Sequence, residues 1–199
     1  MTSAPIPGAE GPVDVGVRRE QLSSAAAVAL VTALNAELSG RYPSRLDCHF
    51  DLAEEEVEAG RGMFVVASIG DTDVGCGAVR LIDDDVAELK RMFVVPEFRG
   101  RRIAAVVLCA LEDETRALGA NRVVLETGIR SPEALALYGR AGYHEIERFG
   151  PFVASSVSVC MARTSGQSEP SPSRVPAPPG GSLRGLFDRH SEFLEVRHA

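Results

Sequence analysis

Three arginines and a glycine stand where a strand-like run gives way to a helical pattern. In the segment PEFRGRRIA, Arg99, Arg101 and Arg102 surround Gly100, and an apolar helical run begins near Ile103. The start of a helix carries unpaired backbone N–H groups and a partial positive charge. A guanidinium group can also donate two parallel hydrogen bonds to the oxygens of one phosphate. The segment therefore has the chemistry of a pyrophosphate site. A basic turn exposed to water is the alternative that these residues leave open.

The spacing of apolar residues changes at this turn, from short runs typical of strands to helical spacing. Before the turn, three apolar runs are separated by GDTD and DDD, short polar breaks of the kind that join neighbouring antiparallel strands. These predicted strands are Met63–Ile69, Val74–Ile82 and Val86–Val95. After the turn, helical spacing from Ile103 to Leu118 predicts a helix that Gly119 ends.

The remaining elements complete a mixed sheet. A first helix is predicted from an N-cap at Ser23 or Ser24 to a stop at Gly40, and Ser131 followed by proline opens the last helix. Further strands are predicted at Val13–Val17, Asn121–Thr127, Tyr143–Ile146 and Val157–Met161, with a short acidic helix in Ala53–Gly60. A helix links the third strand of the meander to the strand at Asn121, so these two strands run parallel. The predicted fold is α/β (α+β), a mostly antiparallel mixed sheet with one parallel strand pair joined by a helix.

Composition limits the function classes. The 199 residues carry a formal net charge of −7, which gives no global attraction to nucleic acid or anionic lipid. The four cysteines show no paired spacing, so neither a zinc site nor a disulfide framework is expected, and they are interpreted as small buried residues in a reducing compartment. No run has the length of a membrane span or the pattern of a secretion signal, and the expected location is the cytoplasm.

The chain divides by composition into three parts. Residues 1–12 are rich in Pro, Gly and Ala and predict a flexible N-terminus, and residues 13–163 form the predicted domain. Residues 164–199 begin as a linker rich in Pro, Ser and Gly and end in a short helical peptide around Leu186. Two interpretations of this peptide stay open: it docks on its own domain, or it binds a partner.

Three segments in order resemble the signature segments of GNAT acyltransferases: AELKRMFV, PEFRGRRIA and LETGIRSPEALALYGRAGY. The resemblance spans about residues 13–163. The arginine turn is similar to the family pattern Q/R-x-x-G-x-G/A at Arg99, Arg102 and Ala104, and Ala134 to Tyr143 resembles A-x-x-L-Y-x-x-x-G-Y. Two positions depart from the pattern. Arg102 replaces the usual central glycine, and Ser131 replaces an asparagine that often precedes the last helix.

The resemblance implies that acetyl-coenzyme A binds as cosubstrate between the two parallel strands, with no metal. Backbone groups of Met92, Phe93 and Val94 would pair with the pantetheine amides like an added strand and polarise the thioester carbonyl. The N–H groups from Arg99 to Ala104 would bind the pyrophosphate, and Ser131 would contact the cofactor. These N–H groups belong to Arg99, Gly100, Arg101, Arg102, Ile103 and Ala104. Arg102 is expected to adopt helical angles and to add a guanidinium contact.

Two residues are the catalytic candidates. Attack by an amine requires loss of a proton, and Glu88, which strand alternation places on the face of Met92, is the candidate base. Its alternative role is an ion pair with Lys90 or Arg91. Family relatives use a tyrosine at the position of Tyr138 to protonate the departing thiolate, so Tyr138 is the candidate acid. Its alternative role is packing among the apolar residues of its own helix.

The resulting functional prediction is an N-acetyltransferase that moves an acetyl group from acetyl-coenzyme A to a primary amine of a small molecule or peptide in a ternary complex. The alternative is a non-catalytic sensor of acyl-coenzyme A that signals through the C-terminal peptide. Glu126 is either a substrate contact or a strand end, and the histidines show no ligand spacing. A homodimer and a partner for the C-terminal peptide are left open. Nucleotide binding would require a P-loop or Rossmann glycine pattern, and the arginine turn has neither.

Overall fold

Short polar breaks separate the apolar runs of the chain, and most runs form the element that their periodicity predicts. The computed structural model describes residues 14–42 and 52–164. The strands are β1 (Gly16–Arg19), β2 (Gly62–Ile69), β3 (Thr72–Asp83), β4 (Val86–Val94), β5 (Arg122–Gly128), β6 (His144–Ile146) and β7 (Ser158–Thr164). The α-helices are α1 (Ala25–Arg41), α2 (Ile103–Ala117) and α3 (Pro132–Arg140), and short 3-10 turns lie at Glu54–Glu56, Pro96–Phe98 and Gly150–Phe152.

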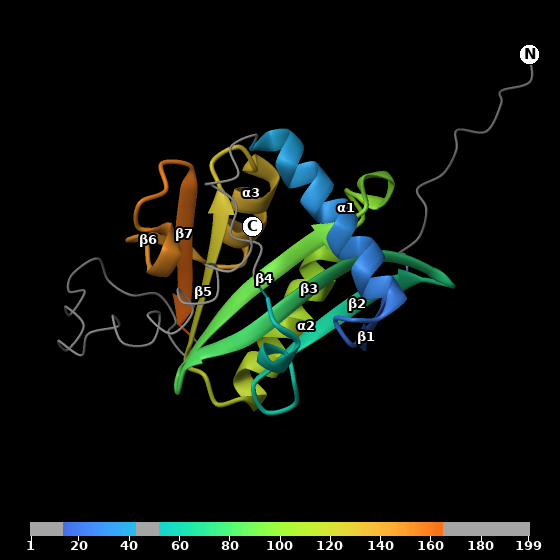
Figure 1. Cartoon of the computed structure of the whole chain (residues 1–199), viewed down its shortest axis with the longest axis horizontal. Helices are drawn as coiled ribbons and strands as arrows, with labels where there is room; N and C mark the ends of the chain where they lie inside the picture. Colours follow the sequence, from blue (N-terminus) through green and yellow to red (C-terminus); the bar gives the residue numbers. More distant parts are fainter. Residues whose placement is uncertain (1–13, 43–51, 165–199) are drawn as a thin grey trace, which may run out of the picture. The chain divides into compact units, whose positions relative to one another are not determined.

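The strands form one mixed sheet in the order β1-β2-β3-β4-β5-β7-β6 (Figure 1). Neighbouring strands from β1 to β4 pair antiparallel, as the predicted meander requires. Strands β4 and β5 are parallel and α2 connects them, and the pairs on the other side of β5 are antiparallel. The predicted fold, a mostly antiparallel sheet with one parallel pair, is confirmed.

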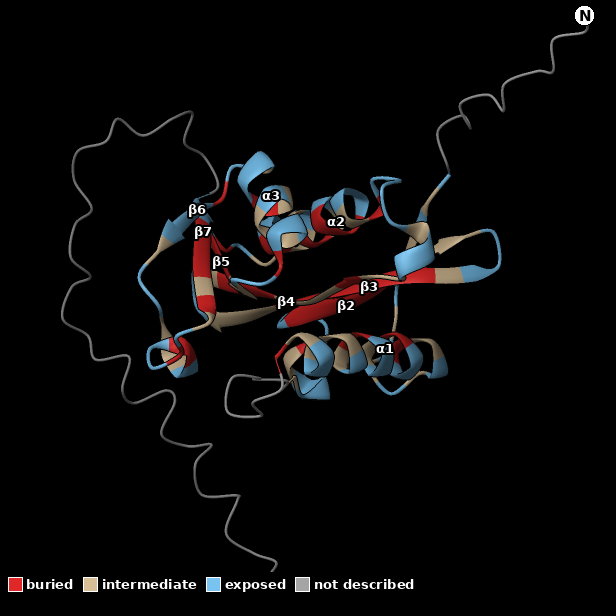
Figure 2. Cartoon of the chain, turned by 90° about the horizontal axis from the view of Figure 1, so that it is seen from above, coloured by how far each residue is buried: buried red, intermediate tan, exposed pale blue. Residues whose placement is uncertain are grey.

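Helices cover both faces of the sheet. Viewed along the sheet, α2 and α3 lie on one face and α1 lies on the other (Figure 2). Alternating residues of β2 illustrate the consequence, since Val65 packs in the core beneath α2 whereas Phe64 and Val66 pack in a second core against α1. Because both faces are buried, the central strands are apolar in nearly continuous runs.

The helix ends follow local capping chemistry with some departures from the prediction. The Ser24 hydroxyl accepts a hydrogen bond from the Ala27 N–H at 3.2 Å and caps α1. Gly40 was the predicted stop, but it lies inside the last turn of α1, which continues to Arg41. Helix α2 ends where predicted, with Gly119 at φ 81° after its last turn. The predicted acidic helix is only the 3-10 turn at Glu54–Glu56.

A one-residue bulge interrupts β4. Ala78 of β3 lies opposite Lys90, yet Cys76 lies opposite Phe93, so β4 contains one residue more than its partner between these points. Arg91 stands in this bulge with φ 57°. The bulge shifts the alternation of side chains by one, which has a direct consequence for the predicted catalytic strand.

Glu88 and Met92 lie on opposite faces of the sheet. Leu89 and Met92 pack with the core beneath α2, while Glu88, the neighbour of Leu89, points toward the face that α1 covers. The prediction that Glu88 and Met92 share a face is therefore wrong. Strict alternation holds only in a strand without an extra residue, and the extra residue at Arg91 reverses the direction of every side chain after it.

The parallel strands β4 and β5 separate soon after they meet. Their paired residues run from Val86 opposite Arg122 to Leu89 opposite Leu125. Beyond Leu89, β4 continues to Val94 with pairing to β3 alone among the described residues. The diverging strands open a cleft at the middle of the sheet.

Several sequence predictions fall outside the described residues. The predicted flexible segment 1–12, residues 43–51 of the segment before β2, and residues 165–199 of the C-terminal part lie there. Among the helices that the structure describes, none is long and apolar enough to cross a membrane.

Candidate active site

A cavity of about 1030 Å³ occupies the cleft between β4 and β5 and extends between α1, α2 and α3. It brings together both catalytic candidates and nearly all of the predicted cofactor residues. Those that line it are Glu88, Met92, Phe93, Val94, Arg99, Gly100, Arg102, Ile103, Ala104, Ser131 and Tyr138. The exception is Arg101, whose guanidinium lies 5.6 Å from the centre of the Phe98 ring and outside the cavity wall.

The turn before α2 presents backbone N–H groups to this cavity. The Arg99 N–H already donates to the Pro96 carbonyl at 3.2 Å, and the next backbone donation is from Ala105 to the Arg102 carbonyl at 3.0 Å. Within the described residues, the N–H groups between these two have no acceptor among the backbone carbonyls. This series of free donors at a helix start has the chemistry of an anion site.

Arg102 adopts a left-handed conformation, with φ 63° and ψ 11°, at the N-cap of α2. The sequence prediction of helical angles is therefore wrong. Gly100, two residues earlier, has φ 81°, so two residues adopt left-handed backbone conformations just before the helix begins. A residue with a Cβ in this region costs roughly 1–2 kcal/mol, which explains the preference of the family pattern for glycine here.

The Arg99 side chain secures the turn to its surroundings. Its Nε donates to the Val94 carbonyl at 3.0 Å, and one terminal nitrogen donates to the Glu37 carboxylate on α1 at 2.6 Å. Its guanidinium carbon also lies 5.8 Å from the centre of the Phe93 ring. Arg99 thus fixes the position of the turn relative to β4 and α1.

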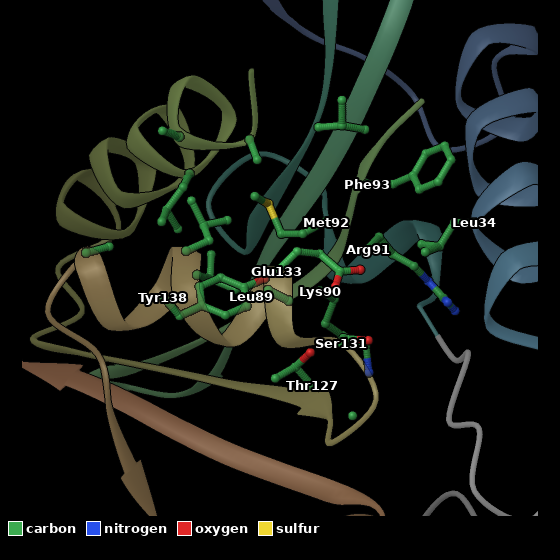
Figure 3. Close-up of a pocket in the computed structure, with 18 of the residues that line it drawn as sticks. Leu34, Leu89, Lys90, Arg91, Met92, Phe93, Thr127, Ser131, Glu133 and Tyr138 are labelled. Carbon is green, nitrogen blue, oxygen red and sulfur yellow. The ribbon is translucent and has the colours of Figure 1, made fainter. Parts of the chain in front are cut away.

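The edge of β4 that faces the cleft has the features of a backbone recognition strand. On its other edge, Phe93 pairs with Cys76 and Val94 pairs with Gly75 of β3. Figure 3 shows Phe93 beside Leu34 on the side of α1, whereas Met92 points the other way. The free edge could accept an extended amide-bearing ligand as an added strand.

Glu88 lies at the centre of a buried charge network. Its side chain is only 4% exposed, and its Oε2 accepts a hydrogen bond from Arg80 Nε at 2.8 Å and forms a salt bridge with a terminal Arg80 nitrogen at 2.7 Å. Arg80 also binds Glu56, and the Lys90 Nζ lies 3.9 Å from Glu88 Oε1. The predicted pairing with Lys90 is thus secondary to a pair with Arg80. Sequence reasoning missed Arg80, although the DDD turn places it opposite Glu88 in the hairpin.

Two further titratable residues line the cavity near Glu88. Burial lowers the pKa of Lys90, and the nearby Glu88 carboxylate opposes this change. Burial raises the pKa of Glu126 on β5, the positive charge of Lys90 lowers it, and the negative charge of Glu88 adds to the rise. A partly buried amine and a partly buried carboxyl group with displaced pKa values are typical of functional sites.

Tyr138 lies on α3 with its side chain packed in the core beneath α2 and α3. The residue is 5% exposed, and its ring meets the Tyr143 ring edge-on at a centroid distance of 5.7 Å. Burial raises the pKa of Tyr138, and the negative charge of Glu126 raises it further. The hydroxyl therefore stays protonated across the neutral pH range. Tyr138 therefore both packs in the core and lines the cavity, so packing and a position in the cavity do not exclude each other.

Ser131 precedes α3 but does not cap it with its side chain. Its hydroxyl instead accepts a hydrogen bond from Arg41 at the end of α1, at 3.2 Å. The same guanidinium binds Glu133 on α3 and Glu37 on α1, the latter at 2.8 Å. This charge cluster connects α1 to α3 across the wall of the cavity.

Cysteine placement partly departs from the prediction. Cys76 and Cys160 are buried, as predicted, but Cys109 on α2 is exposed and lines the cavity. Among the residues that the structure describes, no three His, Cys, Asp or Glu side chains are arranged to hold a metal ion.

Comparisons with known proteins agree on one family. The sequence model of the acetyltransferase (GNAT) family matches residues 30–143. The IAA acetyltransferase of Azospirillum brasilense is 34% identical over 154 residues, which cover 75% of this chain and 97% of that protein.

Two solved structures show the same fold. A proposed acyl-CoA N-acyltransferase from Klebsiella pneumoniae has a TM-score of 0.64 at 28% identity, covering 75% of this chain and 97% of that one. A GNAT family acetyltransferase from Elizabethkingia anophelis with acetyl-CoA bound has a TM-score of 0.56 at 15% identity, covering 78% of this chain and 99% of the other.

Proposed function

The chain belongs to the GNAT acetyltransferase family, and we propose that it transfers an acetyl group from acetyl-coenzyme A to a primary amine of a small molecule or peptide. One observation carries the proposal. Glu88 and Tyr138, a carboxylate and a protonated phenol, line the same cavity where β4 and β5 separate. A reaction that removes a proton from an amine and supplies one to a thiolate requires these two kinds of group.

The residues of the cleft fit the cosubstrate. The free N–H groups from Gly100 to Ala104 suit its pyrophosphate, and the edge of β4 at Met92–Val94 that no described strand covers suits its pantetheine amides. Arg102 is exposed at the same turn, where its guanidinium adds positive charge for the phosphates. When bound, acetyl-coenzyme A supplies the thioester that an amine can attack. The acetyl-CoA bound to the Elizabethkingia anophelis relative supports this assignment.

Glu88 is the proposed base. Arg80 holds one carboxylate oxygen with a hydrogen bond and a salt bridge, so the carboxylate has a fixed position. The other oxygen faces Lys90 at 3.9 Å, too long for a direct hydrogen bond. This oxygen can accept the proton of an acceptor amine directly or through a water molecule.

Tyr138 is the proposed acid. The residue lines the cavity, and its hydroxyl holds its proton at neutral pH, since burial raises its pKa further above the ordinary tyrosine value. The sulfur of the leaving group gains negative charge as the C–S bond breaks, and it then takes this proton. Tyr143 is the natural control: it contacts Tyr138 edge-on, but its own hydroxyl binds Glu112 at 3.0 Å and it does not line the cavity.

Release of free thiol from acetyl-coenzyme A tests the proposed function, measured with a panel of amines, amino acids, aminoglycosides and peptides. Turnover with one class of amine is expected. Binding of acetyl-coenzyme A without turnover on any acceptor would instead support a non-catalytic sensor.

The pH dependence of kcat/KM tests the base. Glu88→Gln is expected to remove the lower limb of the profile, because an amide cannot accept the proton. Glu56→Gln is the matched control, since Glu56 is the other carboxylate that binds Arg80. A lower limb that survives in Glu88→Gln would contradict the assignment of Glu88.

A further inference from the structure

The chain contains a single lysine. Of its 21 Lys and Arg residues, Lys90 alone is a lysine and the remaining 20 are arginines. A guanidinium stays protonated in proteins, whereas a lysine amine can lose its proton and become a nucleophile. The position of this one residue in the fold is therefore informative.

Lys90 lies in the wall of the cavity, at the point where the parallel strands part. It follows Leu89, the last residue of β4 that pairs with β5, and precedes the bulge at Arg91. Its side chain is 10% exposed. Figure 3 shows Lys90 among the residues that line the cavity, together with Leu89 and Arg91.

The surroundings of Lys90 are charged on several sides. Carboxylates and guanidinium groups from β3, β4, β5 and the turn before β2 act on its ammonium: Glu56, Arg80, Glu88, Arg91 and Glu126. The Glu88 Oε1 is 3.9 Å from the Lys90 Nζ, so a proton acceptor lies beside the amine. Burial lowers the pKa of Lys90 despite the opposing effect of Glu88, which increases the fraction of neutral amine at a given pH.

We infer that Lys90 is a self-acetylation site, at which the cleft that serves the acceptor amine also acetylates the protein's own lysine when no acceptor is present. This inference rests on the proposed function, because the acetyl donor is acetyl-coenzyme A. The observations that carry it are the single lysine, its place in the cavity wall and the adjacent Glu88 carboxylate.

The chemistry balances without another reactant. The Lys90 ammonium loses one proton to solvent, and the neutral Nζ forms a C–N bond with the thioester carbonyl carbon while the C–S bond breaks. A second Nζ proton passes to the Glu88 carboxylate, and the departing sulfur takes the Tyr138 proton. The products are an amide on Lys90 and free coenzyme A thiol, and exchange with solvent restores both side chains.

Acetylation would change the cavity that produced it. It removes the positive charge of Lys90 beside Glu88 and Glu126. The repulsion between the two carboxylates is then no longer offset by this charge. The added acetyl group also occupies space in the cavity. Turnover of an external amine should therefore fall as Lys90 becomes acetylated, so the modification lowers the activity of the enzyme.

The experiment uses the full chain with isotope-labelled acetyl-coenzyme A and no added amine. Peptide mass spectrometry is expected to find one labelled acetyl group on the peptide that contains Lys90, at a rate that rises with pH as the amine loses its proton. Lys90→Arg, which keeps the positive charge, is expected to abolish this label while retaining the melting temperature. Tyr138→Phe is expected to slow labelling, because the thiolate then lacks its proton donor.

Calorimetry of acetyl-coenzyme A binding and thiol release with an amine are measured in parallel. Binding and amine turnover without a label on Lys90 would overturn this inference and leave the proposed function intact. Failure to bind acetyl-coenzyme A would overturn both. Labelling of urea-unfolded protein at the same rate would show uncatalysed acetylation and would also overturn the inference.

Discussion

The left-handed conformation of Arg102 predicts a substitution that stabilises the protein. Arg102 has φ 63°, and its side chain is exposed, so its backbone energy can be changed without disturbing a core. Arg102→Gly removes the Cβ that makes this conformation costly. Arg102→Ala removes the guanidinium but keeps the Cβ, and the difference between the two variants isolates the backbone.

The magnitude follows from two opposing contributions. Relief of the left-handed strain at Arg102 is worth roughly 1–2 kcal/mol. Greater freedom of glycine in the unfolded chain offsets roughly 0.4–1 kcal/mol of this gain. The net stabilisation of Arg102→Gly over Arg102→Ala is thus about 0.5–1 kcal/mol, or about 2 °C in Tm for a domain of this size. Arg102→Ala itself should leave stability within about 0.5 kcal/mol of the wild type.

Equilibrium urea unfolding measures these differences, and calorimetry with coenzyme A measures the role of the side chain. If the guanidinium contacts a phosphate, its loss costs roughly 1.5–3 kcal/mol of binding, which weakens Kd by about tenfold or more in both variants. Equal unfolding free energies for the glycine and alanine variants would refute the strain argument. Tighter coenzyme A binding by Arg102→Ala would show that the guanidinium obstructs the site.

Three further predictions concern the cavity and its supports. Tyr138→Phe should lower kcat on the order of a hundredfold with little change in the KM for acetyl-coenzyme A, whereas the control Tyr143→Phe should not. An effect of Tyr138→Phe on KM alone would contradict the acid role. Because burial raises the pKa of Glu126, its ionisation lowers stability as pH rises from the ordinary glutamate value through the raised one. Glu126→Gln should therefore raise Tm near neutral pH but not in acid, and equal shifts at both pH values would refute this. A Cβ at Gly128 would lie 1.9 Å from the Tyr42 Oη, so Gly128→Ala should lower the free energy of unfolding by about 1–3 kcal/mol in urea titrations. Gly139→Ala, with nothing within 4 Å of its Cβ, is the control, and equal losses at both glycines would exclude the clash.

Local sequence signals predicted much of the fold because they act over short distances. The change from apolar runs to helical spacing located β4 and α2, and Gly119 marked the end of that helix. The parallel pairing of β4 and β5 followed from the single helix between them. Order and direction of these elements were enough to bring Glu88 and Tyr138 to one cleft.

The features that the sequence did not predict depend mainly on which residues of neighbouring strands lie opposite each other. An extra residue in β4 is visible in sequence only as two adjacent polar residues, Lys90 and Arg91, within an apolar run. The pair of Glu88 with Arg80 requires the exact alignment of two strands, which alternation alone does not give. The left-handed angle of Arg102 has no signal in its own residue type, since arginine has no preference for it. The signal for this angle was the glycine that the family pattern has at the position of Arg102, because glycine is the residue that adopts positive φ most readily.

The short seam between β4 and β5 has a mechanical consequence. Two antiparallel sections of the sheet, β1 to β4 and β5 with β7 and β6, meet through only four paired residues, from Val86 to Leu89 on β4. Two stiff sections that share one short edge bend most easily at that edge. The lowest-energy motion of the sheet should therefore be a hinge motion that opens and closes the cleft. A ligand that contacts both sections holds them in one relative position. Amide exchange should therefore slow on ligand binding throughout both sections, including β7, which lies one strand beyond the cleft.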